Sequence, residues 1–315
     1  VKVKTGPSTL AVAGLPGSAF AEAMDAARLG FGLFGIIHSI TMRVEPIFNV
    51  HHVDQTRASM DDTLDNLKQI VTTHDYCDLY WFPFSAGVWL KTYHRTHRPV
   101  TVGRLRAQSE RKFQHAGMRV GQRVCRWLVQ HPRHTPTICN LLSQFIPSRD
   151  AVEPVLGGIH FQTAIEFMHA RNMEIGFELD EDFANVQRGW RIAVDLVSRY
   201  ARKGKWPLNL ALNARFLGNS RSLLSPCHGR KHTCFMEIMS FRDTPGWDDF
   251  VAELGGAWLK LPGAAPHWPK EFEQIPGVFD NIAARYGQNL RRFAQLRKDL
   301  DVDPDNLFVN RLTRR

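Results

Sequence analysis

The chain has 315 residues, of which 43% are hydrophobic and 23% are charged. This composition is typical of a globular protein and excludes a fibrous or largely disordered chain. Lys and Arg total 40 against 31 for Asp and Glu, and the formal net charge of +9 favours an anionic partner, such as a nucleic acid, a membrane surface or a phosphorylated cofactor. The longest apolar stretch, around residues 31–40, is shorter than the ~20 residues that span a bilayer, so we expect no transmembrane segment.

The cysteine and histidine patterns indicate neither a disulfide scaffold nor a metal site. The five cysteines are odd in number, are scattered and include no C-x-x-C pair, which favours a reducing compartment. The histidine pairs His94/His97 and His131/His134 stand in polar contexts without a third ligand of matching character nearby. The first residues show no signal-peptide pattern. We therefore expect a protein that is cytoplasmic or peripherally associated with a membrane.

The N-terminal part combines a glycine-rich turn with a strand. Residues 30–35 contain three glycines, which either let the backbone approach a ligand closely or simply allow the turn. Residues 36–44 read as a strand that Pro46 stops.

A helix and two strands are expected next. Asp61 and Asp62 favour the N-terminus of a helix over residues 60–71. Residues 78–84 predict a strand that a proline ends, and residues 88–93 predict its neighbour.

A basic block occupies residues 101–150, where nine basic residues face two acidic ones. Apolar residues recur at helical spacing within it, at Val120, Val124, Trp127 and Leu128, with Arg119, Arg123 and Arg126 between them. Such a basic amphipathic helix can lie on an anionic membrane through residues 104–133, or it can pack on its own domain with a solvated charged face. No nucleic-acid binding motif accompanies the charge, so we expect no nucleic-acid partner.

The C-terminal half predicts a sheet with helices. Residues 172–179 read as a strand, and Asp180 or Asp182 can cap the helix that follows and stops near Gly204. The strand 208–216 has one wholly apolar face, which favours a central position.

Two strands carry the most informative polar residues. The other face of strand 208–216 bears Asn213 and Arg215, and a buried Arg215 needs a partner or a ligand. Strand 233–241 is apolar except for Glu237 and can pair with it antiparallel, so we predict Glu237 as the partner of Arg215. His267 and Lys270 lie in a proline-bracketed loop, the kind of segment in which binding residues often lie.

Five landmarks in order carry a resemblance to a known family. They are Gly32-Leu-Phe-Gly-Ile-Ile-His-Ser-Ile-Thr with Val44-Glu-Pro, Tyr80-Trp-Phe-Pro, Ala214-Arg-Phe with Leu224-Ser-Pro-Cys227, Pro266-His-Trp-x-Lys270, and Asp303-Pro-x-x-Leu-Phe-x-Asn310. From about residue 20 to the end, outside the basic block, the chain resembles the C-terminal two-thirds of an aldonolactone oxidase. These FAD enzymes include the D-arabinono-1,4-lactone and L-gulono-1,4-lactone oxidases and belong to the vanillyl-alcohol-oxidase superfamily.

The resemblance implies an α+β fold in which an antiparallel substrate (cap) sheet is flanked by helices. Residues 1–46 would be the edge of an FAD-binding domain whose core precedes them, 47–262 the substrate domain, and 263–315 a segment that returns to the flavin. FAD would lie beside the backbone of Gly32, Gly35, Ile36 and Ile37 and near His267.

The implied reaction oxidises a CH–OH group of a sugar 1,4-lactone. Hydride passes to flavin N5, and dioxygen reoxidises the flavin to give hydrogen peroxide. Arg215, Lys270 and His267 would be catalytic, while Asn213 and Glu237 would bind substrate. The family usually has Glu at position 213, and here Glu237 would replace the missing charge. The alternatives are an alditol or sterol oxidase of the same superfamily, or a flavin-less binding module without activity.

Overall fold

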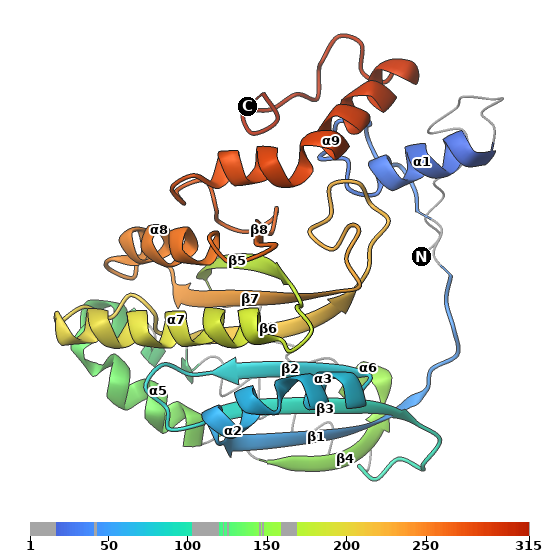
Figure 1. The fold of residues 1–315 in the computed structure, drawn as a ribbon. Coiled ribbons are helices and arrows are strands. Elements are labelled where there is room, and N and C mark those ends of the chain that lie inside the picture. The colour runs from blue at the N-terminus through green and yellow to red at the C-terminus, as the bar shows by residue number, and fades with distance from the viewer. Residues whose placement is uncertain are drawn as a thin grey trace. The chain divides into compact units, whose positions relative to one another are not determined.

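The computed structural model describes residues 17–40, 43–102, 120–121, 123–124, 126–144, 146, 148–158 and 169–314, and Figure 1 draws its fold. The chain divides into two compact units. The first comprises Val1–Pro46, Asn219–Lys231 and Ile282–Arg315, and the second Ile47–Gly218 and His232–Asn281. Five of the nine basic residues of the predicted basic block lie outside the described residues, namely Arg104, Arg106, Arg111, Lys112 and Arg119.

The second unit is built on an eight-stranded sheet with the order β4-β1-β3-β2-β6-β7-β5-β8, in which every named pair is antiparallel. The strands are β1 (Asn49–Ala58), β2 (Tyr76–Trp81), β3 (Val88–Thr96), β4 (Arg149–Pro154), β5 (Ala170–Glu178), β6 (Ala211–Gly218), β7 (His232–Phe241) and β8 (Ala265–Pro266). The predicted α+β class and the antiparallel pairing of the two polar strands are confirmed. β6 lies between β2 and β7, the central position that its apolar face predicted.

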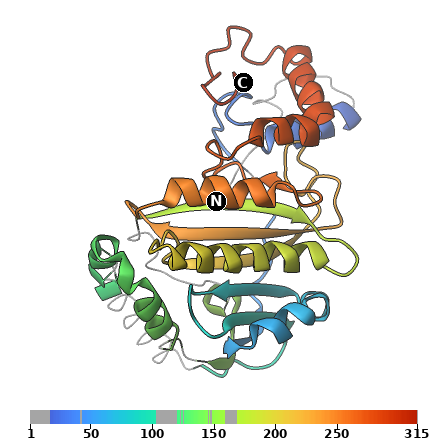
Figure 2. The same cartoon turned by 60° about the vertical axis from the view of Figure 1, so that its left-hand side comes forward.

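Helices join and cover these strands. They are α2 (Met60–Asp65), α3 (Leu67–Thr73), η1 (Pro132–His134), α5 (Thr135–Gln144), α6 (Val155–Gly158), α7 (Ala184–Arg202) and α8 (Trp247–Trp258). α7 and α8 lie over one face of the β6-β7-β5 part of the sheet (Figures 1 and 2). Among the described residues, no helix is long and apolar enough to cross a membrane.

The core of this unit lies between the sheet and α7 and α8. Phe177 of β5 meets the edge of Trp258 of α8, with ring centroids 5.7 Å apart. Gly189 of α7 lies so close to Met236 that a Cβ there would stand 2.4 Å from the methionine methyl group, so a side chain at this position would displace the end of Met236. The indole of Trp258 donates a hydrogen bond to the Gly189 carbonyl at 2.8 Å. The helices therefore take the apolar face of the sheet and leave the opposite face for polar side chains.

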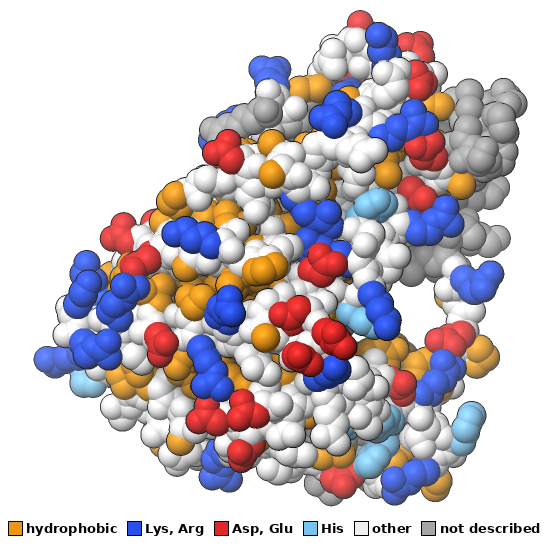
Figure 3. All heavy atoms as spheres, in the orientation of Figure 1, with side chains coloured by type: hydrophobic (Ala, Val, Ile, Leu, Met, Phe, Trp, Pro, Cys, Tyr) orange, Lys and Arg blue, Asp and Glu red, His pale blue; other side chains and the backbone are white. Residues whose placement is uncertain are grey.

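The outer surface of the same helices carries charges of both signs (Figure 3). Arg191 of α7 pairs with Asp61 and Asp65 near α2, and Arg199 pairs with Glu253 of α8 at 2.5 Å. These exposed pairs contribute little stability individually, and they keep this face from being uniformly basic.

The first unit contains α1 (Gly17–Ala27) and most of α9 (Val278–Asp299). Ala23 and Met24 form a small core with neighbouring apolar residues, and Phe34 meets Phe293 of α9 edge-on at 5.1 Å. Arg297 donates to the Leu33 carbonyl at 2.9 Å, so the glycine-rich turn is held against this helix.

Two sequence predictions differ from the structure. The prediction of a strand over residues 36–44 was wrong for the described part of that segment. Residues 36–39 and 43–44 are not in a strand, and Ile36 is 79% exposed. The helix over 60–71 is divided into α2 and α3 at Asn66, whose side chain donates to the Asp62 carbonyl at 2.9 Å and competes with the helical hydrogen bonds.

Candidate functional site

The candidate site lies on the sheet face opposite α7 and α8, at β6, β7 and β5. Directly opposed residues of neighbouring strands point to the same face of a sheet. Asn213 lies opposite Glu237, and Glu237 lies opposite Glu174 of β5. Arg215 lies two residues beyond Asn213 on the same face. The alternation of each strand thus sends its apolar residues to the helices and these polar ones to the site.

Glu174 joins Arg215 and His267 in one ionic cluster. Its side chain is 0% exposed. The Arg215 Nε donates to Oε1 at 2.9 Å, and Nη2 donates to Oε1 at 2.6 Å and to Oε2 at 2.9 Å. His267 Nδ1 forms a short hydrogen bond with the other side of the carboxylate, at Oε2. Arg215 Nη1 has no hydrogen-bond partner among the described residues, so this donor remains for a ligand.

Glu237 forms a second cluster with Lys270. The Lys270 Nζ donates to Oε1 of Glu237 at 2.6 Å, and Asn172 of β5 donates to the same oxygen at 2.9 Å. The Lys270 side chain is 20% exposed and that of Glu237 is 9% exposed. An ammonium and a carboxylate therefore stand together beside the Arg215 cluster, where both can meet a hydroxyl-bearing ligand.

The loop that carries His267 and Lys270 is attached to the edge of β5. The backbone N–H of His267 donates to the Glu174 carbonyl at 3.0 Å, and that of Glu271 donates to the Asn172 carbonyl at 3.0 Å. The Glu271 side chain also pairs with Arg171 at 2.7 Å. These bonds fix the loop at both ends, so its two functional side chains have defined places.

Phe235 of β7 supports the histidine. Its ring centroid lies 5.0 Å from that of His267. The residue opposite it on β5 is Gly176, where a Cβ would stand 3.1 Å from the phenyl ring. Since any side chain at Gly176 would push on this ring, the glycine makes room for the surface on which His267 packs.

The site also includes polar residues beside Arg215 on the same face of the sheet, namely Asn213, Tyr80 and Asp78. The Asn213 amide is buried and donates to the Leu79 carbonyl of β2 at 3.1 Å. Tyr80 lies opposite Asn213, and Asp78 lies opposite Arg215. Burial, assisted by the charges of Asp78 and Glu237, raises the pKa of Tyr80, so its hydroxyl keeps its proton at neutral pH.

The electrostatics of the cluster keep Glu174 and Arg215 charged. Burial raises the pKa of Glu174, but the hydrogen bond from His267 and the positive charge of Arg215 outweigh it, and the net pKa is lowered. Burial lowers the pKa of Arg215, and the charge and hydrogen bonds of Glu174 outweigh this as well. The cluster thus holds an ionised carboxylate with no access to solvent.

The predicted site residues fall into two groups. Arg215, His267, Lys270 and Glu237 come together as described. The prediction that Glu237 is the partner of Arg215 was wrong, because the hydrogen-bond partner of Arg215 is Glu174 and that of Glu237 is Lys270. Arg215 reaches past its direct neighbour on β7, which is Phe235, to a carboxylate on the strand beyond.

Four of the five residues predicted to lie beside a cofactor, Gly32, Gly35, Ile36 and Ile37, belong to the first unit, and the fifth, His267, belongs to the second. Gly32 and Gly35 have φ angles of +78° and +91°, a conformation that glycine adopts at no cost, and both face open space. Ile36 and Ile37 follow with exposed side chains. The turn at 30–35 that the sequence predicts is confirmed, with the Gly35 N–H donating to the Gly32 carbonyl at 3.0 Å.

Glu174 is the functional candidate that the sequence reasoning missed. One signal was present: it is a lone charge between Met173 and Ile175 in a strand that is otherwise apolar at its centre. A carboxylate in such a place must be paired.

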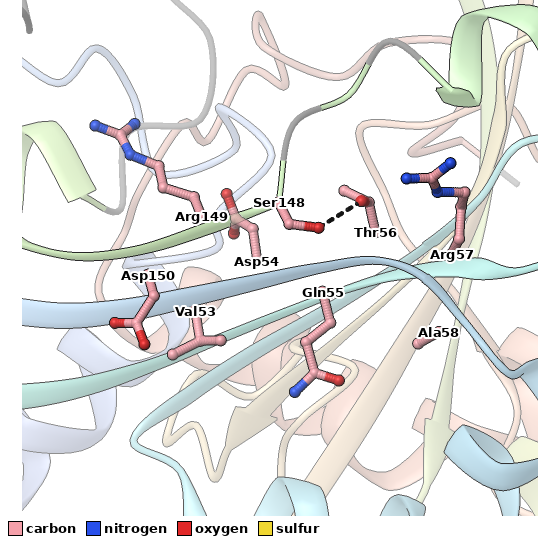
Figure 4. Close-up of a pocket in the computed structure, with 9 residues that line it drawn as sticks. All are labelled: Val53, Asp54, Gln55, Thr56, Arg57, Ala58, Ser148, Arg149 and Asp150. Carbon is pink, nitrogen blue, oxygen red and sulfur yellow. Dashed lines mark hydrogen bonds between the residues drawn. The ribbon is translucent and has the colours of Figure 1, made fainter.

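A separate pocket of about 490 Å³ lies between β1 and the start of β4 (Figure 4). It is lined by Val53–Ala58 and Ser148–Asp150, and Ser148 and Thr56 share a hydrogen bond of 2.8 Å across it. None of the predicted site residues lines it.

The chain matches a known protein family and is similar to several known proteins. The family described as D-arabinono-1,4-lactone oxidase matches residues 40–315. The L-gulono-1,4-lactone dehydrogenase of Mycobacterium tuberculosis is 26% identical over 292 residues, which is 92% of this chain and 62% of that protein. The L-gulonolactone oxidase of Scyliorhinus torazame is 23% identical, with 92% and 62% covered. The chain therefore spans less than two-thirds of the length of these relatives.

A solved structure shows the same fold. Cholesterol oxidase from Brevibacterium sterolicum superposes with a TM-score of 0.62 at 13% identity, covering 85% of this chain and 60% of that one. At this identity the likeness concerns the fold alone.

Proposed function

Since this chain belongs to the D-arabinono-1,4-lactone oxidase family, we propose that it forms the substrate-binding part of an FAD-dependent enzyme that oxidises a CH–OH group of a sugar 1,4-lactone. The observation that carries the proposal is the cluster in which a fully buried Glu174 holds Arg215 and His267 side by side, next to the Lys270–Glu237 pair.

The charge balance of the site supports a neutral substrate. Each cation is already paired, Arg215 with Glu174 and Lys270 with Glu237. A carboxylate or phosphate ligand would need an excess of positive charge, which these pairs do not provide. A lactone or polyol needs only hydrogen-bond donors and acceptors, and Arg215 Nη1 and the Lys270 ammonium provide donors.

The described residues also fit a flavin. Gly32 and Gly35 present an open, left-handed backbone next to exposed apolar side chains at Ile36 and Ile37, a surface on which an aromatic ring system can lie. When bound, FAD would supply the acceptor for the hydride that leaves the substrate carbon. We assign these four residues, together with His267, to the cofactor.

We assign to His267 the role of the base that accepts the proton of the reacting hydroxyl. An ionised Glu174 only accepts hydrogen bonds, so His267 Nδ1 carries its hydrogen and Nε2 is left with a lone pair. Nε2 takes the hydroxyl proton while the C–H bond breaks, and the carbinol becomes a carbonyl. Arg215 Nη1 donates to the oxygen on which charge develops.

Glu237 and Asn213 together take the place of the glutamate that the family usually has on β6. Because Asn213 and Glu237 are directly opposed, a carboxylate at 237 lies on the same patch of the sheet. The Asn213 amide donates its hydrogen bond to the Leu79 carbonyl, and Glu237 with Lys270 binds a substrate hydroxyl.

The test is oxidation by the complete gene product loaded with FAD. We expect a yellow protein that oxidises D-arabinono-1,4-lactone or L-gulono-1,4-lactone, and an Arg215→Met variant that keeps its colour and loses about 100-fold or more in kcat/KM. A panel with alditols and sterols separates the alternatives. A yellow, folded protein that oxidises no lactone contradicts the proposal.

We further propose dioxygen as the electron acceptor, with hydrogen peroxide as product. The relatives differ here, since one is named a dehydrogenase and another an oxidase. Peroxide formation in air, compared with reduction of an artificial dye under nitrogen, distinguishes the two. Turnover with the dye and none with oxygen would assign a dehydrogenase.

A peripheral membrane contact is proposed for the described part of the basic block. Arg123, Arg126 and Trp127 are exposed, and α5 adds the exposed Leu141 and Leu142. Basic and large apolar side chains together favour an anionic lipid surface. Changing Arg123 and Arg126 to Glu should abolish binding to vesicles that contain phosphatidylserine, whereas Arg202→Glu on α7 should not. Absence of binding by the unchanged protein refutes the contact.

A further inference from the structure

The side chain of Asn172, on β5, is turned to the carboxylate of Glu237. Its Nδ2 donates to Oε1 of Glu237 at 2.9 Å, and Lys270 Nζ donates to the same oxygen at 2.6 Å. A carboxylate only accepts hydrogen bonds, so the NH2 end of the amide is the end that faces it. Among the described residues, Glu237 is the only hydrogen-bond partner of the Asn172 side chain. An amide and an ammonium therefore converge on one oxygen of the carboxylate.

The other oxygen of Glu237 is left for a ligand. Oε2 has no hydrogen-bond partner among the described residues, and it is not one of the buried polar atoms that lack a partner. The 9% of the side chain that is exposed therefore includes this atom. Glu237 thus keeps one oxygen occupied and offers the other to the site.

The backbone of Asn172 also fixes the segment that carries Lys270. Its carbonyl accepts the N–H of Glu271 at 3.0 Å, and Glu271 directly follows Lys270 in the chain. The Glu271 side chain in turn pairs with Arg171 at 2.7 Å. One residue of β5 therefore holds the loop with its carbonyl and Glu237 with its amide.

The amide gives the carboxylate a direction that the ammonium alone does not. An ammonium is a compact charge on a flexible stem, so with Lys270 alone either oxygen of Glu237 can take it. The amide of Asn172 is carried by a short side chain on a strand, and it defines one place for Oε1 and thereby one direction for Oε2. An acceptor that is oriented before the ligand arrives does not have to be ordered on binding.

The two clusters of the site stand close enough to meet neighbouring hydroxyls of one sugar ring. Glu174 and Glu237 are directly opposed, which places their Cβ atoms about 5 Å apart. Arg215 and His267 are bonded to Glu174, and in the proposed function they meet the reacting hydroxyl. Oε2 of Glu237 is an acceptor and needs a ligand group that donates a hydrogen. A hydroxyl on the next carbon provides one, whereas a hydrogen or an ether oxygen in its place does not.

We propose that Asn172 is a positioning residue for Glu237 and that it sets the specificity of the site, by turning Oε2 towards the hydroxyl next to the reacting one. The ligand class that follows is a lactone with two neighbouring ring hydroxyls. The identity of this ligand rests on the proposed function, whereas the hold of Asn172 on Glu237 does not.

The experiment compares three ligands on the complete gene product loaded with FAD. They are D-arabinono-1,4-lactone, whose ring carries two neighbouring hydroxyls, and the two analogues that each have hydrogen in place of one of them. We expect the unchanged protein to bind the lactone about 100-fold more tightly than either analogue, because each hydroxyl meets its own cluster. Asn172→Leu should lower the preference over one analogue about tenfold and leave the preference over the other within twofold.

A double-mutant cycle tests whether Asn172 acts through Glu237. Glu237→Gln should lower the same preference about tenfold, and adding Asn172→Leu should change it by less than twofold, because the acceptor that Asn172 directs is already gone. Asn172→Ser takes the place of the leucine variant if a melting curve shows that the latter does not fold.

Asn49→Leu is the matched control. Asn49 begins β1 in the same sheet, and its side chain also donates one hydrogen bond at 2.9 Å, to the Arg98 carbonyl. This variant should keep both preferences. Equal loss of both preferences in Asn172→Leu, no loss of either, or additive effects in the double variant overturns the proposal.

The hold on Glu237 is also measured without a ligand. The side-chain NH2 signal of Asn172 in the NMR spectrum is identified by its absence in Asn172→Leu, and its exchange with water should be about tenfold faster in Glu237→Leu. A rate within twofold of that in the unchanged protein contradicts the positioning role. If the unchanged protein binds no lactone, the proposed substrate is wrong and the assigned ligand class falls with it, and this exchange still decides whether Asn172 positions Glu237.

Discussion

Glu174→Gln is the substitution that probes the candidate site most directly. The change keeps the size of the side chain and removes its negative charge. Glu174 is 0% exposed and accepts three hydrogen bonds from Arg215 and one from His267. Breaking a buried pair by removing one partner costs about 3–5 kcal/mol when the remaining charge stays buried. Because the Arg215 side chain is 39% exposed and can recover solvent, we expect about 2 kcal/mol.

The effect on turnover should exceed the effect on folding. An amide at 174 presents a donor and an acceptor to His267, so the tautomer with a free Nε2 is no longer enforced. Loss of the orienting carboxylate from a catalytic histidine lowers kcat by up to about 10⁴-fold in a well-studied hydrolase. We expect a fall in kcat/KM of about 100-fold or more for lactone oxidation, with the flavin still bound.

The assay combines steady-state kinetics with a melting curve for each variant. Glu178→Gln, an exposed carboxylate at the end of the same strand, is the matched control and should retain the kinetics of the unchanged protein. A Glu174→Gln enzyme with unchanged kcat/KM would refute the catalytic role of the cluster. So would a loss of activity no greater than the fraction of unfolded protein.

Three further predictions concern pH, packing and the second cluster. The lowered pKa of Glu174 contributes stability that is present above the ordinary carboxyl value of 4.5 and is lost as the pH falls through the folded value, so the difference in melting temperature between the unchanged protein and Glu174→Gln should shrink in acid. Gly176→Ala should displace the Phe235 ring, 3.1 Å from the added Cβ, and lower kcat/KM about tenfold, whereas Gly218→Ala, where a Cβ has open space, should not. Glu237→Gln should raise KM for the lactone about tenfold with less change in kcat, and equal kinetics would contradict substrate binding at this position.

The sequence predicts the strands of the site well and their arrangement less well. Period-two alternation placed Asn213 and Arg215 on one face of a central strand, and the structure confirms both points. The antiparallel pairing of β6 with β7 was also predicted, but its register was not, because Glu237 lies opposite Asn213 and Arg215 lies opposite Phe235. Helix boundaries depend on local competition, as the break at Asn66 illustrates.

The partner of Arg215 could not be predicted because it depends on the order of strands. Glu174 lies on β5, which pairs with β7 and not with β6. Arg215 reaches it across β7, a contact between residues 41 apart in sequence. Alternation within a strand carries no information about a residue two strands away. The sequence therefore favoured Glu237, on the adjacent strand, as the hydrogen-bond partner of Arg215.

The register of β6 and β7 also explains how Asn213 can stand where the family usually has a glutamate. Cβ atoms of directly opposed residues are about 5 Å apart, less than the length of a glutamate side chain with its ligand. A carboxylate at Glu237 on β7 therefore lies on the same patch of the sheet as one at position 213 would. This difference from the family has one consequence for Arg215, which would lose a neighbouring acceptor on its own strand. Glu174 supplies the acceptor for Arg215 instead, and Glu237 pairs with Lys270.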